Sequence, residues 1–372
     1  MTTRPLESSA ERQIIPGKRG HTWLEIEQQP LLWPTTVDRV SDGRARLHLQ
    51  SKLKDAHVVI TGAGTSAYAA TAVASAWPES AAVASTDLLL ATERYIRDAN
   101  VLLSLARSGD SPESIAVVHR VHRLRPDVWH LAITCNSRGA LATSSLVNSI
   151  VLDPRTNDQS LVMTSSFSNL VLAGLCLANR LVMGPLTECA AAQAQVQFCR
   201  IDKATSALAQ KLEDRIVLLA SAPLFGWAQE GALKVLEMTG GKFPVMAETY
   251  LGLRHGPMSF IRDNTMVVCL LANDPWIRRY EIDLITELKA KGLGYLIGIC
   301  SDDSESTNPP EIFDVVIPAL LPQAPDSLRT PFEILAPQLF AYHLSVQSGL
   351  NPDNPSPAGV INRVVQGIHI HE

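Results

Sequence analysis

The 372-residue chain contains no apolar run that approaches the roughly 18 uncharged residues needed to span a bilayer, which argues against a membrane protein. It also has no excess of positive charge, because 32 basic residues stand against 37 acidic ones and give a formal net charge of −5. A chain without a basic field is a poor partner for a nucleic-acid backbone or an anionic membrane surface. Its first residues lack the basic-then-apolar order of a secretory signal. We therefore expect a cytoplasmic protein that binds neither nucleic acid nor membrane.

Motifs for metals, disulfides and nucleotides are missing as well. The six cysteines form no C-x-x-C pair, and most lie in apolar segments, where a reduced thiol behaves as a small hydrophobic side chain. We therefore expect no metal site and no disulfide framework. The pair Gly62-x-Gly64 lacks the third glycine of a dinucleotide-binding fingerprint, and the chain has no P-loop sequence, so a nucleotide cofactor is disfavoured.

The chain does contain two series of short, uncharged β-branched runs that alternate with longer helical patterns. The first series extends from Val58 to Leu152 and the second from Ile216 to Ile317. Such runs are typical of strands that are buried on both faces of a parallel sheet, with helices as crossovers. The sequence therefore predicts an α/β protein with two tandem doubly wound parallel-sheet domains, each a three-layer αβα sandwich of flavodoxin-like type. A TIM barrel is the alternative fold, because eight strand-like runs can be counted.

Composition indicates where these domains begin and end. We expect an N-terminal arm with a short helix (1–45), a first domain (46–200), a second domain (201–349) and a C-terminal tail (350–372). The helix of the arm is predicted from Thr22 to Gln29 and is ended by Pro30. An alanine-rich helical stretch (187–212) connects the two domains, and a last helix (332–349) precedes the tail.

Hydroxyl-bearing residues follow two of the strand-like runs, in Gly62-Ala63-Gly64-Thr65-Ser66 and in Arg107-Ser108-Gly109-Asp110-Ser111. In open α/β sheets, ligands bind beyond the carboxyl ends of strands, where helix amino termini offer unpaired N–H groups and partial positive charge. Glycine lets the backbone approach a ligand closely, so both loops are candidate phosphate sites. The alternative is that the hydroxyls only cap helices. Arg107 either pairs with the phosphate or extends to solvent.

Glu230, Lys234 and Glu237 stand at i, i+4 and i+7 in a helical stretch, which places them on one face. This spacing is most often a solvated ladder of ion pairs. The rest of the stretch is apolar and small, so we expect the charged face to line a cleft. There, a lysine stabilises developing enolate charge, and a carboxylate acquires the raised pKa that a general base requires. His255, between Arg254 and Gly256-Pro257, is a further candidate for proton transfer.

These segments together resemble the sugar isomerase (SIS) domain family. Four of them are similar to the isomerase half of glucosamine-6-phosphate synthase: 60–66, 104–111, 230–237 and 254–257. A likeness to the AgaS-type tagatose-6-phosphate ketose/aldose isomerases and galactosamine-6-phosphate deaminases extends from about Trp23 to His371. It includes Arg107-Ser108-Gly109-Asp110-Ser111-Pro112-Glu113-Ser114, Ile133-Thr134-Cys135-Asn136, Met163-Thr164-Ser165-Ser166 and Asn362-Arg363-Val364-Val365-Gln366-Gly367.

The resemblance implies a role for each candidate residue. Those expected to bind the sugar phosphate are Gly64, Thr65, Ser66, Arg107, Ser108 and Ser111, and those expected to contact sugar hydroxyls are Thr164 and Ser165. Glu237 would move a proton between C1 and C2 with support from Lys234 and Glu230. His255 would assist ring opening in the site of a neighbouring subunit, which implies a homodimer or higher oligomer. The tail would lie over the active site.

Two departures from the synthases shape the expected reaction. The synthases carry a tail lysine that aids ring opening, whereas the stretch 353–362 has none, so that Arg363 is the nearest basic residue and ring opening rests on His255. The chain also lacks a glutaminase domain. We therefore expect deamination of an amino-sugar 6-phosphate, galactosamine 6-phosphate, to a ketose 6-phosphate and ammonia. No metal or organic cofactor is expected, because the substrate amine and Lys234 can delocalise charge.

Three alternatives remain open at the level of sequence. Two are enzymatic, namely aldose/ketose isomerisation without loss of nitrogen and deglycation of a fructosamine phosphate. The third is a non-catalytic phosphosugar sensor. A sensor is expected to carry a helix-turn-helix and to tolerate loss of the charged helix face. Only a short arm precedes the first domain, and Glu230, Lys234 and Glu237 are all present, so the sensor is disfavoured.

Overall fold

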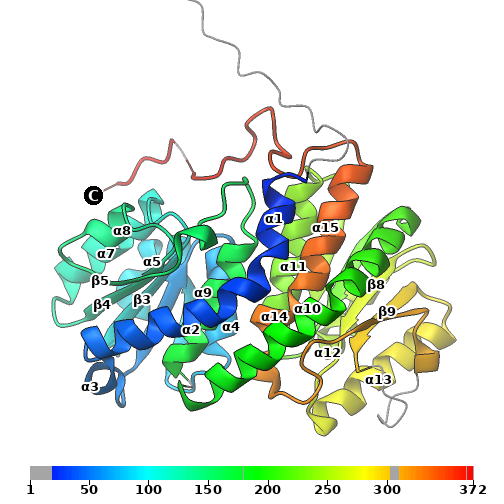
Figure 1. Ribbon diagram of the computed structural model, residues 1–372, viewed down its shortest axis with the longest axis horizontal. Helices are drawn as coiled ribbons and strands as arrows, with labels where there is room; N and C mark the ends of the chain where they lie inside the picture. Colours follow the sequence, from blue (N-terminus) through cyan, green and yellow to red (C-terminus); the bar gives the residue numbers. More distant parts are fainter. Residues whose placement is uncertain (1–18, 179, 302–309, 366, 372) are drawn as a thin grey trace, which may run out of the picture.

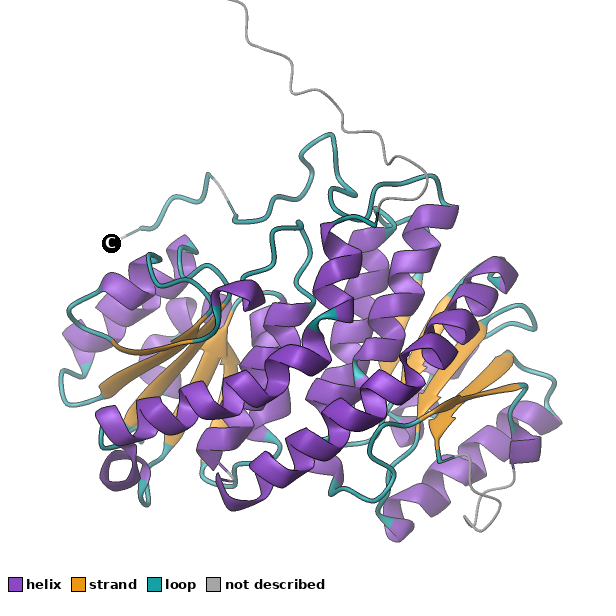
Figure 2. Cartoon of the chain, in the orientation of Figure 1, coloured by secondary structure: helices purple, strands orange, loops and turns teal. Residues whose placement is uncertain are grey.

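The computed structural model describes residues 19–178, 180–301, 310–365 and 367–371. Two separate five-stranded parallel sheets form the body, as Figures 1 and 2 show. The first has the order β2-β1-β3-β4-β5 and consists of β1 (Val58–Gly62), β2 (Ser80–Ala84), β3 (Val101–Ala106), β4 (Trp129–Thr134) and β5 (Asn148–Val151). The second has the order β10-β9-β8-β6-β7 and consists of β6 (Ile216–Leu219), β7 (Val245–Glu248), β8 (Met266–Leu270), β9 (Tyr295–Cys300) and β10 (Val315–Pro318). The prediction of two doubly wound α/β units is confirmed, and the TIM-barrel alternative is wrong.

Helices cover the sheets and fill the space between them (Figures 1 and 2). Those of the first half are α1 (His21–Glu27), α2 (Gln29–Arg46), α3 (Leu49–Leu53), α4 (Thr65–Ala74), α5 (Ser85–Leu90), α6 (Thr92–Tyr95), α7 (Pro112–Leu124), α8 (Ala140–Thr143) and α9 (Ser165–Ala178). The long α10 (Arg180–Lys211) connects the halves. The remaining helices are α11 (Phe225–Met238), α12 (Tyr250–Leu253), α13 (Pro275–Ala290), α14 (Thr330–Glu333) and α15 (Leu335–Gln347). Short 3-10 turns are η1 (Pro154–Thr156), η2 (Pro257–Phe260), η3 (Pro310–Ile312) and η4 (Asp326–Leu328).

Helix ends differ from the sequence-based expectation at two prolines. Pro30 does not end the arm but lies in the first turn of α2, where its missing N–H group is not needed. The expected last helix is divided into α14 and α15, and Pro331 occupies the first turn of α14. The tail is joined to the start of the arm, because the Asp353 carboxylate accepts hydrogen bonds from the backbone N–H groups of His21 and Thr22 at 2.9 and 2.7 Å.

One hydrophobic cluster joins the two sheets through the helices between them. It contains Ile60 of β1 and Leu218 of β6 together with Trp33, Phe332 and Trp227 of the helical layer. The rings of Trp33 and Phe332 meet edge to face with centroids 5.0 Å apart. Burial of each such side chain stabilises the fold by about 1.5–3 kcal/mol. The halves therefore share a core, which fixes the position of α11 against α4.

The first sheet has its hydroxyl loops at the switch point. At the corresponding place the second sheet has carboxylate side chains that hydrogen-bond to the backbone. Strand order reverses between β6 and β8, as it does between β1 and β3. At this position the Asp326 carboxylate accepts hydrogen bonds from the N–H groups of Asn273 and Asp274 at 2.7 and 3.0 Å. The Glu281 carboxylate accepts another from the Ala272 N–H group at 2.8 Å. Internal carboxylates thus satisfy amide groups that would otherwise suit an external anion.

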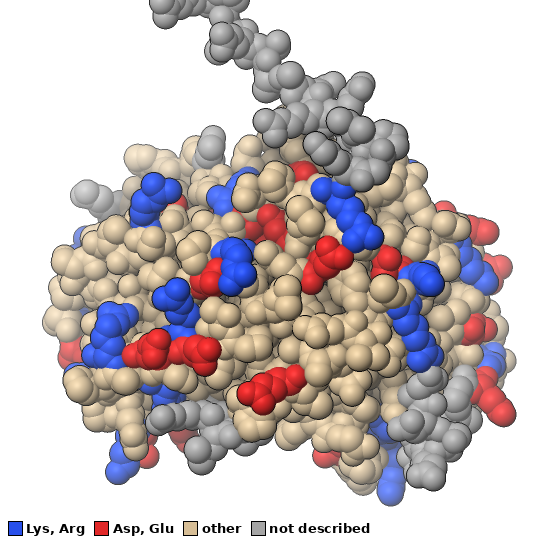
Figure 3. All heavy atoms as spheres, viewed as in Figure 1, with Lys and Arg blue, Asp and Glu red and all other residues tan. Residues whose placement is uncertain are grey.

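The surface shows no broad area of one charge on the face drawn in Figure 3, where Lys and Arg side chains lie among Asp and Glu side chains. Across the residues that the structure describes, no helix has both the length and the apolar composition that a membrane crossing requires.

Candidate active site

A cavity of about 160 Å³ lies at the carboxyl ends of β1 and β3, where strand order reverses in the first sheet. The two hydroxyl loops form one side of it, with Gly64, Thr65, Ser66, Arg107, Ser108, Gly109 and Ser111 in the lining. Glu237 reaches it from α11, Leu161 and Met163 from the segment before α9, and 361–365 from the tail. The cavity therefore joins residues of both halves and of the tail.

The loop between β1 and α4 depends on two glycines. A Cβ at Gly62 would lie 2.5 Å from the Ser66 Cβ, and Gly64 has a φ of 55°, in the left-handed region that favours glycine. No side-chain cap satisfies the amino terminus of α4. The Thr65 hydroxyl instead donates to Glu230 Oε1 at 3.3 Å and accepts from Lys234 Nζ at 3.2 Å. The capping alternative therefore does not describe this loop, and Thr65 connects it to α11.

The loop between β3 and α7 is held from the side opposite the cavity. The Asp110 carboxylate accepts a hydrogen bond from the Ala140 N–H group at 2.8 Å, and the Asn136 amide donates to the Ser108 carbonyl at 3.0 Å. Ser111 does not cap α7 with its side chain. Its hydroxyl donates to Glu113 Oε2 at 2.7 Å. These contacts fix the positions of Ser108 and Ser111 at the start of the helix.

Glu230, Lys234 and Glu237 lie on the face of α11 that meets α4. Lys234 is fully buried, and its ammonium contacts Glu237 Oε2 at 2.5 Å and Glu230 Oε1 at 3.3 Å. The Glu237 side chain is 23% exposed and lines the cavity, whereas the Glu230 side chain is fully buried. The solvated-ladder alternative is therefore wrong, because the charged face is enclosed.

Burial and neighbouring charges shift the pKa values of this group. Burial raises the pKa of Glu230 to about 8, with Lys234 opposing the shift and Glu237 adding to it. Burial lowers the pKa of Lys234, but the charges of Glu230 and Glu237 outweigh it and raise that pKa above its ordinary value. Since the lysine keeps its positive charge, it can stabilise negative charge that develops on a substrate oxygen. Glu237 is the carboxylate of the group that a substrate can reach.

Relatives cover nearly the whole chain. AgaS from Streptomyces coelicolor is 37% identical over 371 residues, which cover 94% of this chain and 95% of that protein. The D-galactosamine-6-phosphate deaminase AgaS of a Shewanella species is 35% identical over 383 residues, covering 95% of this chain and 92% of that protein. The chain belongs to the AgaS family.

The likeness extends to solved structures of related proteins. The crystal structure of a tagatose-6-phosphate ketose/aldose isomerase from Escherichia coli matches with a TM-score of 0.82 and 29% identity. The match covers 95% of this chain and 97% of that one. A search of protein-family models gives no match. The SIS-type fold expected for an AgaS protein is thus present in full.

Five predicted residues of this AgaS-family chain lie outside the cavity lining. Two of them, Glu230 and Lys234, are fully buried beside Glu237. Thr164 and Ser165 are fully buried, and their backbone N–H groups donate to the Asp158 carboxylate at 2.9 and 3.1 Å. His255 lies in the exposed segment after α12 and does not line the cavity of its own chain. In Figure 1, α12 lies low in the view while the tail crosses the top. The described part of the cavity therefore contains no imidazole.

Arg107 lies in the cavity lining but makes contacts that the sequence did not predict. Its guanidinium donates to the carbonyl oxygens of Ser160, Leu161 and Val162 at 3.3, 3.0 and 3.4 Å and also to the Arg363 carbonyl. The side chain is 6% exposed, and burial lowers its pKa. It does not extend to solvent.

Sequence reasoning missed the residues that organise this side of the AgaS cavity. Asp158 and Glu25 hold the segment before α9, and Leu161 and Met163 present it to the cavity. An acidic residue shortly before Thr164-Ser165-Ser166 is a signal for the start of a helix, so Asp158 could have been found. Met163 belongs to a segment of the AgaS likeness, but no pattern in the sequence points to Glu25 or Leu161.

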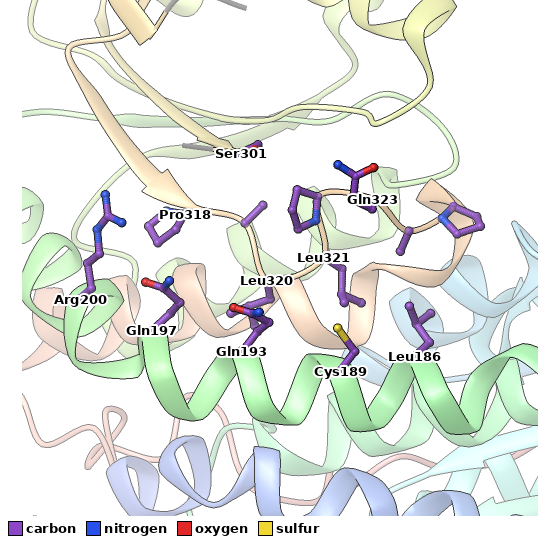
Figure 4. Close-up of a pocket in the computed structure, with 14 residues that line it drawn as sticks. Leu186, Cys189, Gln193, Gln197, Arg200, Ser301, Pro318, Leu320, Leu321 and Gln323 are labelled. Carbon is purple, nitrogen blue, oxygen red and sulfur yellow. The ribbon is translucent and has the colours of Figure 1, made fainter. Parts of the chain in front are cut away.

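A larger cavity lies elsewhere, between α10 and the segment after β10 (Figure 4). It measures about 550 Å³ and is lined by Cys189, Gln193, Gln197, Arg200, Gln323 and neighbouring apolar residues. Among the residues that the structure describes, its lining contains no carboxylate, histidine or lysine. Acid/base chemistry is therefore assigned to the smaller cavity.

Proposed function

We propose that this protein converts an amino-sugar 6-phosphate, D-galactosamine 6-phosphate, into tagatose 6-phosphate and ammonia. The observation that carries the proposal is the position of Glu237 in the same cavity as Ser66, Ser108 and Ser111. One side of the cavity offers hydroxyls and helix amino termini for a phosphate, and the other offers a carboxylate beside a buried ammonium. The names of the AgaS relatives support this choice of substrate.

The reaction follows from these positions. The phosphate binds at the loops after β1 and β3, where we assign contacts to Gly64, Thr65, Ser66, Ser108 and Ser111. In the open-chain aldehyde, Glu237 removes the proton from C2 while the oxygen at C1 takes up a proton, which gives an enolamine. Glu237 then returns its proton to C1 as the nitrogen at C2 releases one, which leaves a hydroxymethyl group at C1 and an imine at C2. Water then adds to the imine carbon, and ammonia leaves as the ketone forms. Lys234 stabilises the charge on the oxygen at C1 during the transfer.

Ring opening needs a further proton carrier, which we assign to His255 of a second copy of the chain. Two observations support this assignment. His255 is exposed on its own chain, and the described lining of the cavity contains no histidine. Arg363 does not replace the missing tail lysine, because its guanidinium donates to the Asp158 carbonyl and to Asn157 Oδ1. The working unit is therefore proposed to be a homodimer or a larger homo-oligomer.

An ammonia-release assay across a panel of sugar phosphates tests the proposal. D-galactosamine 6-phosphate is expected to yield ammonia and tagatose 6-phosphate in equal amounts. A plain isomerase would interconvert aldose and ketose phosphates without releasing ammonia, and a deglycase would act on fructosamine phosphates instead. Absence of both ammonia and ketose phosphate from the D-galactosamine 6-phosphate reaction would remove the assignment.

A further inference from the structure

Arg107 reaches two segments that are far apart in the sequence. Its Nη1 group donates to the carbonyl oxygens of 160–162, and its Nη2 group donates to the carbonyl oxygen of Arg363 in the tail. Both segments line the cavity, through Leu161 and Met163 on one side and 361–365 on the other. The planar guanidinium suits this bridge because it directs several N–H groups into one plane.

The Arg363 side chain in turn donates hydrogen bonds to the segment that precedes α9. Its Nε group donates to the Asp158 carbonyl at 2.9 Å, and its Nη2 group donates to Asn157 Oδ1 at 2.8 Å and to the same Asp158 carbonyl. The side chain of Arg107 therefore holds the backbone at Arg363, while the side chain of Arg363 holds the backbone at 157–158. The two arginines therefore hold the tail at Arg363 to the segment 157–162, and we call this set of contacts the clamp.

The segment that receives both arginines is itself anchored. Glu25 of α1 accepts hydrogen bonds from the N–H groups of Gln159 and Ser160 at 2.5 and 3.2 Å. The Leu161 N–H group donates to the Asp353 carbonyl at 3.0 Å, so the start of the tail is fixed to the same segment. The segment that holds the tail at Arg363 is therefore itself held by α1 and by the start of the tail.

We propose that Arg107 and Arg363 are positioning residues that together hold residues 361–365 as a wall of the substrate cavity. The role of Arg107 is to set the position of the tail rather than to neutralise the phosphate. This inference rests on the proposed function only for the identity of the substrate. The geometry of the clamp is independent of what the cavity binds.

Thermolysin cleavage of the intact protein without substrate tests the clamp. This protease cuts before large apolar residues, and the tail offers Val360, Ile361, Val364, Val365 and Ile368. Arg363→Ala and Arg107→Gln are each expected to release C-terminal peptides about tenfold faster than the wild type, because each removes charge-assisted hydrogen bonds to the wall. Mass spectrometry of the released peptides separates cleavage in the tail from cleavage of unfolded protein.

Two further variants serve as controls. Arg155→Ala removes an arginine of η1 whose side chain pairs with Asp153 and lies outside the cavity, so this variant should be cut at the wild-type rate. Arg107→Lys keeps the positive charge but loses the planar fork. The clamp predicts that Arg107→Lys is cut as fast as Arg107→Gln. A phosphate-neutralising role predicts instead that neither change at position 107 affects cleavage.

Steady-state kinetics with D-galactosamine 6-phosphate give the second readout. Loss of the wall is expected to raise KM about fivefold or more in Arg363→Ala and in both Arg107 variants, with a smaller change in kcat. If Arg363→Ala shows wild-type cleavage and wild-type KM, the proposal is overturned. Cleavage at the wild-type rate in Arg107→Gln overturns it as well. If the wild type releases no ammonia, the proposed function fails, while the cleavage rates still decide on the clamp.

Discussion

Lys234 is the residue on which the acid/base chemistry of the cavity depends, because its ammonium is fully buried between two carboxylates and the Thr65 hydroxyl. A buried charge is tolerated only with such partners. The arrangement keeps the lysine charged and leaves Glu237 as the group that faces the ligand. Burial raises the pKa of Glu230 to about 8 although Lys234 opposes the shift, so Glu230 holds its proton near neutral pH.

Glu237→Gln is expected to bind substrate but not to turn it over. Glutamine preserves the size of the side chain and removes the basic oxygen, so kcat should fall on the order of 10²- to 10⁴-fold while binding of the sugar phosphate changes little. Ammonia release and equilibrium binding of D-galactosamine 6-phosphate measure the two effects. Glu213→Gln, at an exposed position after α10 and outside the cavity lining, is the matched control and should behave as the wild type. Turnover at the wild-type rate in Glu237→Gln would contradict the assigned role.

Individual residues also show which features of the site could be predicted from the sequence and which could not. The i, i+4, i+7 spacing on α11 placed Glu230, Lys234 and Glu237 on one face, and the small apolar residues around them indicated a cleft. The contacts of Arg107 could not be predicted in this way. They depend on the backbone carbonyl oxygens of residues 160–162 and 363. Every residue has such an oxygen, so the amino-acid sequence does not indicate which ones a side chain will contact.

At the level of elements, α9 is a buried helix whose first turn relies on one carboxylate. Asp158 is 1% exposed and accepts hydrogen bonds from the N–H groups of Thr164, Ser165 and Ser166. A negative charge at this end also favours the helix dipole. Since the same residue offers its carbonyl to Arg363, the start of α9 and the wall of the cavity depend on one position.

Asp158→Ala should therefore destabilise the protein strongly. Three buried N–H groups lose their partner, and the expected cost is about 2 kcal/mol or more in the free energy of unfolding. Denaturant unfolding measures it. Asp153→Ala is the control, because Asp153 caps only the three-residue η1 and pairs with an arginine that is 60% exposed. Equal losses in the two variants would show that the cap of α9 has no special importance.

The strands that sequence reasoning missed are both edge strands. β2 and β7 each lie at the end of a sheet next to the first strand of that sheet, and both are largely half-buried. An edge strand packs one face less completely, so β2 keeps a Ser/Ala-rich sequence and β7 ends in a glutamate. β5 and β10 are edge strands too, but they keep Ile- and Val-containing apolar runs, so they were predictable like the buried inner strands.

The whole molecule should lose stability as pH rises above neutrality. Burial raises the pKa of Glu25 and Glu281 to about 7 and that of Glu230 to about 8, with Asp158 adding to the shift at Glu25. The folded state then holds protons that the unfolded chain has released, so the free energy of unfolding falls as pH increases through 7 to 8. Burial lowers the pKa of His130 to about 4, and its opposing effect is complete by about pH 6.5.

Thermal unfolding between pH 6.5 and 8.5 checks this expectation. The Tm of the wild type should fall by a few degrees across that range, and Glu281→Gln should flatten the slope because it removes one of the three carboxyl groups. Glu287→Gln should leave the slope unchanged, since its partners Lys291 and Arg254 lower the pKa of Glu287 and its titration is finished well below pH 6.5. A Tm that rises from pH 6.5 to 8.5 would be the opposite result.

The switch point of the second sheet, which Asp326 and Glu281 occupy, makes the two halves unequal. The first sheet has loops open to a ligand at its switch point. At the corresponding place in the second sheet, carboxylates of the chain itself accept the hydrogen bonds. We therefore expect one sugar phosphate to bind per polypeptide. The second half instead contributes α11, which packs against β6 and brings Glu237 to the cavity of the first half.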